Sequence, residues 1–444
     1  MTLGTTLRDA RHTHTRGTFA ALGVSVAFTV PGLTLRISGA EAGEIAPPVI
    51  FGFAILGSAF LLAWAAEVLQ LDVSQGLALT VLALIAVLPE YAVDFTFAWK
   101  AGENPDKYAP LALANMTGSN RLLIGIGWSM VVLVAAWRMT RAARRRGYTG
   151  TIDTDVNLER PHAIEIVFLS FATLYSLTLP FKTTLTLVDA AILVSIFVIF
   201  VFRIARAPAE TPHLVGPARL IATLPTNQRR AVVGLLLVYA AGVIFACAEP
   251  FAESLVHLGE EAGVDTFLLV QWVAPLASEA PELIIAGMFA WRLNTSAGFG
   301  TLLSSKVNQW TLLVGSLPIV FALSAGTLHG LPLDSIQREE LFLTAAQSVF
   351  AVAVLVSRSI SVREALALFF LFIGQFVLGG LLPEGAREIE RIAVGILYLV
   401  LAAGILVQQR SYLRPLIRDG VIAPVDELFR EEVDESALPE NPAR

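Results

Sequence analysis

Long apolar runs alternate with short polar segments along almost the whole chain. Between Thr18 and Gln408 these runs are 18 to 29 residues long, and each can cross the roughly 30 Å hydrocarbon layer of a bilayer as a helix. The pattern predicts an all-α polytopic membrane protein. We predict about twelve transmembrane helices, at residues 18–35, 46–69, 76–99, 109–137, 162–180, 183–202, 231–252, 266–291, 297–324, 340–357, 364–382 and 390–408.

The basic residues between the runs predict the orientation, because short cytoplasmic loops accumulate Lys and Arg. With the N-terminus inside, 22 of the 31 basic residues lie on the cytoplasmic side and seven outside, counting Arg391 at the outer end of the last span, while Arg121 and Lys306 fall within spans. We therefore expect both termini in the cytoplasm and the chain in the cell (inner) membrane. The first apolar run could be a signal peptide, but Pro31 and Arg36 do not form a small-residue cleavage site, so a first spanning helix is favoured.

Composition supports membrane insertion and excludes several other classes. Of the 444 residues 55% are hydrophobic and 15% charged, and the mean hydropathy is +0.68, whereas soluble domains carry about 25% charged residues. The single cysteine, Cys247, rules out an intrachain disulfide, and no Cys/His cluster suggests zinc. Neither a nucleophile–base set nor a cofactor motif is present. We therefore expect no enzyme activity, no cofactor and no nucleic-acid partner, and the expected partners are inorganic cations and the lipid bilayer.

An internal repeat organises the chain. "LPEYAVDFTFAWK" (88–100) and "APELIIAGMFAWR" (280–292) share Pro-Glu and Phe-Ala-Trp at the same spacing, and a Ser/Asn-bearing helix follows each copy. In the predicted topology the two copies cross the membrane in opposite directions, which is typical of inverted-repeat secondary transporters. The prediction is two inverted five-helix repeats with one extra flanking helix at each end.

This repeat predicts five parts of the chain. They are a cytoplasmic N-terminal arm with an extra helix (1–43), a first repeat (44–207), a second, inverted repeat (208–382), an extra helix (383–410) and an acidic cytoplasmic tail (411–444). The end of the tail, from Asp426, is expected to be disordered because it is highly charged and poor in apolar residues.

Four carboxylates lie at corresponding depths in the repeated segments: Glu90, Asp94, Glu279 and Glu282. An ionised carboxylate at the bilayer centre costs on the order of 3 kcal/mol, so it persists only when it is paired, lines a cavity or has a function. Each pair is spaced three or four residues apart and shares one helix face. The two faces can converge on one site.

The same segments supply other oxygen ligands. Pro89 and Pro281 lack an N–H, which frees carbonyls just before each glutamate. Carbonyl, carboxylate and hydroxyl oxygens are hard ligands suited to calcium or sodium. The partner helices add further candidate ligands, namely Asn115, Thr117, Ser119, Asn120, Ser304, Ser305 and Asn308.

Alternative roles compete with cation binding at several charged positions. Arg121 and Lys306 are more simply explained by structural pairing with a carboxylate, and with both bases the four carboxylates leave a net charge of −2, which a calcium ion would neutralise. Other acidic residues lie near predicted helix ends, where a solvated or interfacial role is favoured: Glu67, Glu165, Asp189, Glu249 and Glu253. For the duplicated Pro-Glu pair a purely structural role does not explain the twofold placement.

The repeated motifs resemble those of the calcium/cation antiporter superfamily, the sodium/calcium exchangers and their proton-coupled relatives. "IAVLPE" (85–90) and "ASEAPE" (277–282) match the first motif of each alpha repeat, and "GSNRLL" (118–123) and "SSKVN" (304–308) match the second. The resemblance implies that the two Pro-Glu glutamates, Glu90 and Glu282, are the principal ligands for calcium and alternately sodium. It also implies supporting roles for Ser278, Ser119, Ser304 and Asn308.

This sequence departs from the family pattern in both repeats. Ala86 and Val87 replace a Thr-Ser pair and Leu123 replaces an asparagine, while Glu279 and Lys306 stand where a serine and an asparagine are expected. Lys306 is a candidate internal counter-ion that stands in for a bound cation when the site is empty.

The expected function is a secondary-active antiporter that exchanges calcium against sodium or protons by alternating access. Because the departures remove likely sodium ligands, two alternatives stay open. One is a proton-coupled exchanger of sodium or another cation without calcium transport, and the other is a diverged membrane protein that does not transport.

Overall fold

The computed structural model describes residues 3–40, 42–72, 87–207, 214, 216–263 and 265–429, with side chains from Thr18 onward. Eleven helical segments in this part of the chain are long and apolar enough to cross a membrane. They correspond to eleven of the twelve predicted spans and confirm the all-α polytopic fold class. Of the remaining span, 76–99, residues 76–86 lie outside the described part and the rest forms most of a helix.

The helices that cross or line the molecule are α1 (Leu3–Ser38), α2 (Ala46–Leu69), α4 (Leu88–Glu103), α5 (Pro105–Leu122), α6 (Ser129–Arg145), α7 (Ala163–Ser176), α8 (Leu187–Ile204), α10 (Thr226–Ala262), α11 (Thr266–Trp291), α12 (Thr295–Asn308), α13 (Val314–Ala325), α14 (Ser335–Val354), α15 (Val362–Leu381) and α16 (Glu384–Gln408). Shorter helices are α9 (Pro217–Ala222), α17 (Arg410–Ile417) and α18 (Val425–Leu428). Single turns of π or 3-10 helix are η1 (Leu123–Trp128), η2 (Arg160–His162), η3 (Leu179–Phe181), η4 (Gln309–Leu313), η5 (Leu355–Ser357) and η6 (Arg418–Ile422).

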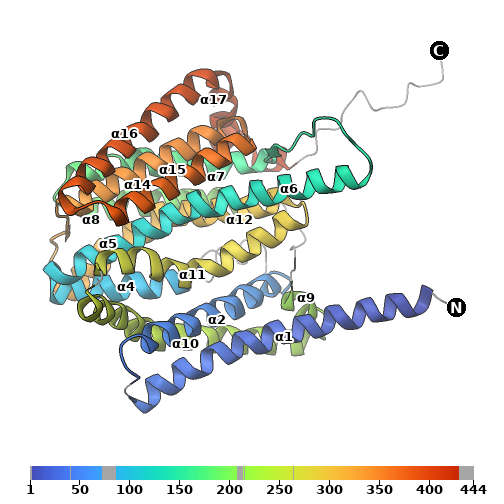
Figure 1. Cartoon of the computed structure of the whole chain (residues 1–444), viewed down its shortest axis with the longest axis horizontal. Coiled ribbons are helices and arrows are strands. Elements are labelled where there is room, and N and C mark those ends of the chain that lie inside the picture. Colours follow the sequence, from blue (N-terminus) through green and yellow to red (C-terminus); the bar gives the residue numbers. More distant parts are fainter. Residues whose placement is uncertain are drawn as a thin grey trace.

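Most of the long helices run side by side in roughly the same direction (Figure 1). α1 and α10 pack on α2 along one edge of the molecule, α16 packs on α14 near the opposite edge, and α4, α5, α11 and α13 pack together between them. The beginning of α1 and α17 lie toward the same end of the bundle, on the right in Figure 1. We call this end the inner side and the opposite end the outer side.

Two pairs of very short strands connect the two halves of the chain. β1 (Val156–Asn157) pairs antiparallel with β4 (Ser359–Ile360), and β2 (Thr184–Leu185) pairs antiparallel with β3 (Leu331–Pro332). The separation in sequence from β1 to β3 equals that from β2 to β4, and we call it the strand interval. β1 of the first copy thus corresponds to β3 of the second, and β2 corresponds to β4. The pair β1–β4 is therefore equivalent to the pair β2–β3, as expected for two repeats related by a pseudo-twofold axis.

Local structure repeats in the same way. A capping box opens α8 at Thr186 and Asp189, and another opens α15 at Ser361 and Glu364, one strand interval later. Two of the π turns, η1 and η4, begin at Leu123 and Gln309, and we call the separation between these two positions the π interval. A π turn inserts one residue into the helical ladder and frequently marks a functional site. The sequence thus repeats its helix starts and its irregular turns as well as its Pro-Glu motif.

The C-terminal segment is more ordered than its composition suggested. Residues 410–428 form α17, η6 and α18, and Leu416, Val425 and Leu428 are buried. Arg160 beside α7 holds Asp419 through two hydrogen bonds of 2.9 and 3.0 Å. The expectation of disorder from Asp426 is wrong for residues 426–428, because these apolar anchors and this ion pair fix the segment. Residues 430–444 lie outside the described part.

Two of the acidic residues expected to be solvated or interfacial are buried. Asp189 is fully buried because it closes the capping box of α8 and accepts a hydrogen bond from Tyr175 at 2.6 Å. Glu165, near the start of α7, is buried as well. In contrast, Glu249 and Glu253 are about half exposed and share Lys100 as a partner.

Candidate functional site

The four predicted carboxylates converge between α4 and α11. Glu90 and Asp94 project from α4 and are buried, as is Glu279 from α11, while Glu282 is half-buried. The Glu90 carboxyl faces both Glu279 and Glu282 and also lies near Ser119 and Gln309. The two copies of the Pro-Glu motif therefore meet at one place, as the repeat predicted.

The prolines contribute differently in the two helices. Pro89 occupies the first turn of α4, where its missing N–H has no partner to lose, so in the described part of the chain it begins a helix rather than breaking one. Pro275 and Pro281 lie inside the continuous helix α11, and Pro275 cannot donate to the carbonyl of Gln271. A Cβ at Gly118 would collide with that same carbonyl oxygen. The glycine thus lets α5 approach α11 closely enough to bring its polar residues to the site.

Many oxygen atoms in this cluster are buried without a hydrogen-bond partner, although more than about nine-tenths of buried polar groups in proteins normally have one. The unpaired oxygens are Glu90 Oε1, Asp94 Oδ2, Asn115 Oδ1, Ser119 Oγ, Glu279 Oε2, Glu282 Oε2, Ser305 Oγ and Gln309 Oε1. Within the described ranges, no three acidic, His or Cys side chains lie close enough together to hold a metal ion by themselves. A cation here would therefore combine carboxylate oxygens with amide and hydroxyl oxygens.

Specific hydrogen bonds hold the carboxylates in place. Asn115 of α5 donates to Asp94 at 2.8 Å, and Gln309 of η4 donates to Glu279 at 2.8 Å. Tyr91, next to Glu90, donates its hydroxyl to Asn308 at 2.9 Å. Sequence reasoning did not single out Tyr91 or Gln309, although each adjoins a residue that was chosen.

Lys306 lies beside this cluster and is completely buried. Its ammonium donates to the backbone oxygen and to the side-chain oxygen of Asn120, both at 2.6 Å, and lies 5.6 Å from the ring centre of Trp310. The negative charges of Glu90 and Glu279 also attract it. Lys306 follows Asn120 by one π interval, so the two residues occupy equivalent positions in the two copies.

The same π interval relates two serines of the site, Ser119 and Ser305. Ser119 lies near the Glu90 carboxyl and its equivalent Ser305 lies near that of Glu282, although neither serine oxygen has a hydrogen-bond partner among the described residues. Ser304, which the motif alignment matched to Ser119, is half-buried and has no hydrogen bond among the described residues. Ser278 is buried one turn before Glu282 and only approaches carbonyls of its own helix, at 3.4 Å.

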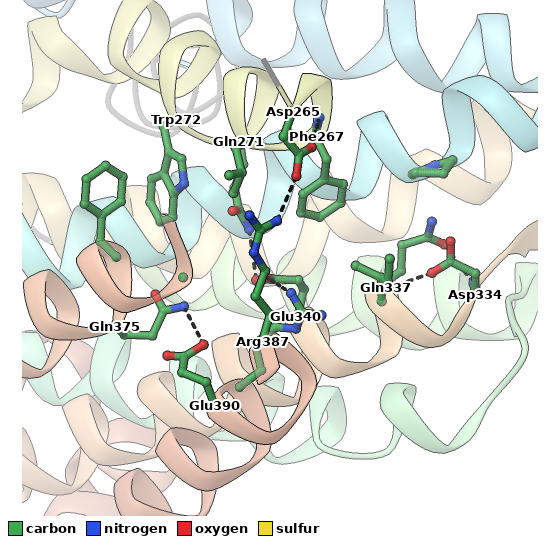
Figure 2. Close-up of a pocket in the computed structure, with 16 residues that line it drawn as sticks. Asp265, Phe267, Gln271, Trp272, Asp334, Gln337, Glu340, Gln375, Arg387 and Glu390 are labelled. Atoms are coloured by element: carbon green, nitrogen blue, oxygen red, sulfur yellow. Dashed lines mark hydrogen bonds and ion pairs between the residues drawn. The ribbon is translucent and has the colours of Figure 1, made fainter. Parts of the chain in front are cut away.

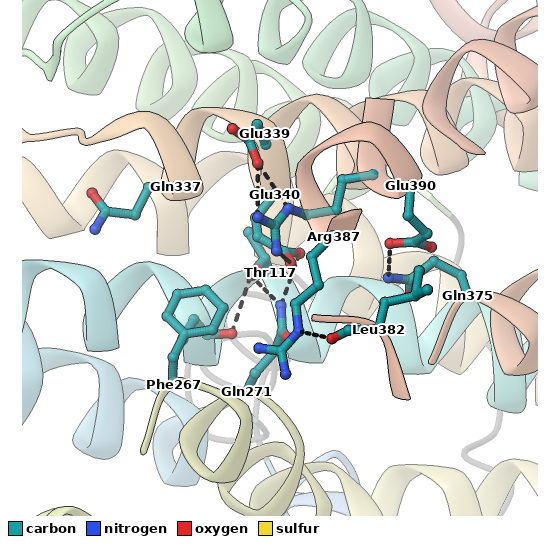
Figure 3. Close-up of polar contacts among 12 residues, drawn as sticks. Thr117, Phe267, Gln271, Gln337, Glu339, Glu340, Gln375, Leu382, Arg387 and Glu390 are labelled. Carbon is teal, nitrogen blue, oxygen red and sulfur yellow. Dashed lines mark hydrogen bonds and ion pairs between the residues drawn. The ribbon is translucent and has the colours of Figure 1, made fainter. Parts of the chain in front are cut away.

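Arg121 lies apart from the carboxylate cluster. Its guanidinium forms a buried ion pair of 2.8 Å with Glu340 of α14 and donates to Gln375 of α15. Gln271 of α11 donates to the same Glu340 oxygen at 2.9 Å, a contact that Figure 3 shows. The expected structural pairing of Arg121 is thus present, and its partner Glu340 is a residue that the sequence analysis did not single out.

Two pockets approach this region from opposite sides. The inner pocket, about 240 Å³, lies between α2, α11 and α12, and Ser278 and Glu282 form part of its wall. The outer pocket, about 260 Å³, lies at the beginnings of α11, α14 and α16 and the end of α15. Figure 2 shows Gln271 and Trp272 pointing from α11 toward Gln375 and Glu340 across it. Of these two pockets, the inner one reaches one of the four carboxylates and the outer one reaches none.

Comparison with known proteins identifies the family. The family model described as sodium/calcium exchanger protein matches residues 48–205 and 232–378. The chain belongs to this exchanger family. The resemblance to the calcium/cation antiporter superfamily is therefore confirmed, and with it the predicted class of cation antiporters.

Solved structures extend the comparison. The crystal structure of the H+/Ca2+ exchanger CAX is 40% identical to this family member, with a TM-score of 0.81, and the match covers 91% of this chain and 99% of that one. Native YfkE, at 13% identity and a TM-score of 0.57, covers 85% of this chain and 100% of its own. A selenium-substituted structure of the Ca2+/H+ antiporter protein YfkE, at 14% identity and a TM-score of 0.54, covers 88% and 99%. The YfkE structures share the fold. Comparison with curated proteins gives no match.

Proposed function

We propose that this exchanger-family chain moves calcium against protons across a cell membrane by alternating access. The observation that carries the proposal is the cluster of buried, unpaired oxygens around Glu90, Asp94, Glu279 and Glu282. A hard divalent cation satisfies such oxygens, and when the cation leaves, protons can replace it on the carboxylates. The 40% identity to the H+/Ca2+ exchanger CAX over 91% of the chain supports the choice of ions.

The charge balance also supports a divalent cation. Arg121 is neutralised by Glu340, so it drops out of the count of charges around the site. Four carboxylates and the Lys306 ammonium then leave a net charge of −3 when all are ionised, rather than the −2 that the sequence suggested. One calcium ion and one proton reduce that charge to zero.

Two features favour protons over sodium as the coupling ion. Val87 and Leu123 are buried apolar residues beside the first-copy motif, and neither offers an oxygen to sodium. The Lys306 ammonium already contacts two oxygens of Asn120. A bound sodium ion would need those same oxygens as ligands. Both features remove room for sodium ions while leaving every carboxylate able to carry a proton.

The orientation and the organisation of the chain follow the same proposal. We place it in the cell (inner) membrane with both termini in the cytoplasm. The beginning of α1 and α17 lie at one end of the bundle, which supports an even number of crossings (Figure 1). Residues 44–207 and 208–382 would form the two repeats, and the two segments matched by the family model lie inside these bounds.

Uptake of radioactive calcium into everted vesicles tests this function. An imposed proton gradient should drive uptake, an equal sodium gradient should not, and Glu282→Gln should reduce uptake by at least about 100-fold because an ion ligand is lost. Ser304→Ala, a change near the site at a residue without a contact to it, is the matched control and should transport normally. Calcium uptake driven only by a sodium gradient would show that sodium, and not the proton, is the coupling ion. Absence of calcium flux under both gradients would refute it.

A further inference from the structure

A buried ion pair closes the bottom of the outer pocket. Arg121 and Glu340 are 2.8 Å apart, with side chains only 2% and 5% exposed. Gln271 donates to Glu340 and Arg121 donates to Gln375, while Arg121 Nε has no hydrogen-bond partner among the described residues. Arg391 of α16 also lies 3.7 Å from the other Glu340 oxygen, and the Arg121 guanidinium lies 5.1 Å from the ring centre of Trp272. Five helices, α5, α11, α14, α15 and α16, therefore meet at this pair.

Such a pair is weak evidence for stability, because the cost of removing two charges from water offsets much of their attraction, and well-packed apolar residues often serve as well. Its best-attested use is to specify one arrangement over another. The position of Arg121 is suited to that use, since the preceding residue, Asn120, holds Lys306 at the cation site. Gln347 of α14 also donates to the backbone oxygen of Arg121 at 3.4 Å.

The pseudo-twofold axis shows that the pair exists on one side only. Glu340 follows Glu165 by one strand interval, and Val307 follows Arg121 by one π interval. The inner counterpart of Arg121–Glu340 is thus Val307–Glu165, which lacks the arginine. Glu165 is buried, and its Oε2 lies 3.8 Å from a ring nitrogen of His162 with no hydrogen bond among the described residues.

The two pockets also differ in whether they reach the carboxylate cluster. On the inner side, where the arginine is missing, the pocket wall includes Glu282. On the outer side the pocket ends at Gln271 and Glu340, and none of Glu90, Asp94, Glu279 and Glu282 lines it. The locked side is the side from which the carboxylates are closed off.

We propose that Arg121 and Glu340 are positioning residues that form a one-sided lock, which holds the carrier with its cation site open to the inner side and must separate for the site to open outward. This inference rests on the proposed exchange function only for its role in transport. The lock sets the resting direction of the carrier, and the missing base at Val307 leaves the inner side free to open.

Side-specific labelling of single cysteines tests the lock without any transport. In a Cys247→Ala background, Thr117→Cys places a thiol behind the lock, next to Gln271, and Ile285→Cys places one in the inner pocket. With Glu340 intact, a membrane-impermeant thiol reagent should label the first thiol slowly from outside and the second rapidly from inside. Glu340→Gln should raise outside labelling about tenfold and lower inside labelling, a shift that corresponds to about 1.4 kcal/mol between the two states.

A matched control and a second variant keep this test decisive. Glu339→Gln removes a neighbouring carboxylate that pairs with Arg391 at 2.8 Å. Arg391 also lies 3.7 Å from Glu340, but this variant keeps the Arg121–Glu340 pair itself, so it should leave both labelling rates unchanged. If Glu340→Gln folds poorly, Arg121→Met with Glu340→Met replaces the pair by apolar side chains and should shift labelling in the same direction. Unchanged rates in a folded variant, or equal effects of Glu339→Gln, would overturn the lock.

The converse variant should create a lock on the inner side. Val307→Arg places a base opposite the native Glu165 and should slow inside labelling of the Ile285→Cys thiol, and adding Glu165→Gln should restore it. In transport, Glu340→Gln should change the maximal rate more than the half-saturating calcium concentration, because the ligands are untouched. If Glu340→Gln shifts the labelling rates as expected but the protein shows no calcium flux, the lock is supported and the exchange function is refuted.

Discussion

The first copy of the repeat carries Val87, Asn120 and Leu123 where the second copy carries Glu279, Lys306 and Gln309. In the folded chain these differences are paired. Glu279 accepts a hydrogen bond from Gln309, so two apolar residues have been exchanged for a bonded polar pair, and Lys306 donates to its own counterpart Asn120. The two copies therefore differ at positions that contact one another, and both Glu279 and Lys306 of the second copy have a hydrogen-bond partner that offsets part of their desolvation.

A further difference concerns backbone packing. Gly118 in the first copy is equivalent to Ser304 in the second, one π interval later. Gly118 lies against the carbonyl of Gln271, where a side chain would collide, whereas Ser304 is half-buried and is not constrained in this way. The first copy provides the close contact and the second provides the extra charges.

Exchanging these two residues should give the largest effect. Gly118→Ser should destabilise the protein by at least about 2 kcal/mol, because it overpacks the contact between α5 and α11. Ser304→Gly should cost about 1 kcal/mol or less, the helix penalty of glycine. Thermal unfolding of the detergent-solubilised protein measures both. Similar losses in the two variants would show that the copies pack alike at this position.

Removing the fixed charge should come next. Lys306→Asn makes the second copy match the first at the Asn120 position and takes one positive charge from the site. Half-saturating calcium should fall about tenfold, as expected for one lost repulsion of roughly 1.4 kcal/mol, and external sodium should begin to compete. Calcium uptake titrated with and without sodium measures this. Ser304→Ala, which leaves the charge and the unpaired oxygens in place, is the control, and an unchanged ion selectivity in Lys306→Asn would contradict the stand-in role.

Replacing the bonded pair Glu279–Gln309 by the first-copy residues should have a smaller effect on calcium affinity. Glu279→Val with Gln309→Leu restores the first-copy residues and should raise half-saturating calcium about fivefold, since one carboxylate is lost but no buried donor is left unpaired. Glu279→Val alone leaves the Gln309 amide without its acceptor and should be worse than the double variant. The double-mutant cycle, measured by calcium uptake, gives the coupling between the two side chains. Additive effects would mean that Glu279 and Gln309 are not energetically coupled.

The smallest effect concerns the C-terminal segment that covers α7 of the first copy. Hydrogen bonds from Arg160 hold the pKa of Asp419 below its ordinary value. A carboxyl with a lowered folded pKa stabilises the docked segment above its unfolded pKa, and this contribution is lost as the pH falls through the folded value. Amide hydrogen exchange in residues 410–428, corrected for its intrinsic pH dependence, should therefore show constant protection between about pH 5 and 8. Protection should weaken only below about pH 4, where the unfolded carboxyl begins to protonate.

The Asp419→Asn variant completes that prediction. It should exchange faster at neutral pH and lose the acid dependence, because no carboxylate remains to protonate. α14, the equivalent of α7 in the second copy, is covered by α16 instead and should show no such change. If hydrogen-exchange protection fell equally with acid in residues 410–428 and in α16, the effect could not be assigned to Asp419.

Much of this architecture could be predicted from the sequence, because hydrophobic length and charge asymmetry act locally. Eleven of the twelve spans were recognised from apolar runs alone, since each helix must satisfy its own backbone in a bilayer. The Pro-Glu repeat and its opposite orientations predicted the meeting of Glu90 with Glu279 and Glu282, because a duplicated, inverted segment brings its copies to one depth.

The partners of the charged residues could not be predicted in this way. Arg121 pairs with Glu340, which lies far away in the sequence, and no local spacing relates them. Gln309 and Tyr91 were overlooked because a polar side chain in an apolar helix acquires its meaning only from the helix that faces it. Ser305 rather than Ser304 lies near Glu282, because a difference of one residue turns a side chain by about 100° around the helix axis.

The sequence by itself determined that this is a polytopic helical protein of the exchanger family with two copies of a carboxylate-bearing motif, because length, charge bias and duplication are properties of the chain. Only the tertiary structure decided which base lies beside the carboxylate cluster, which base pairs with Glu340 and which of the two pockets reaches Glu282. Those outcomes depend on contacts between helices distant in sequence, and their energies arise only when the helices pack.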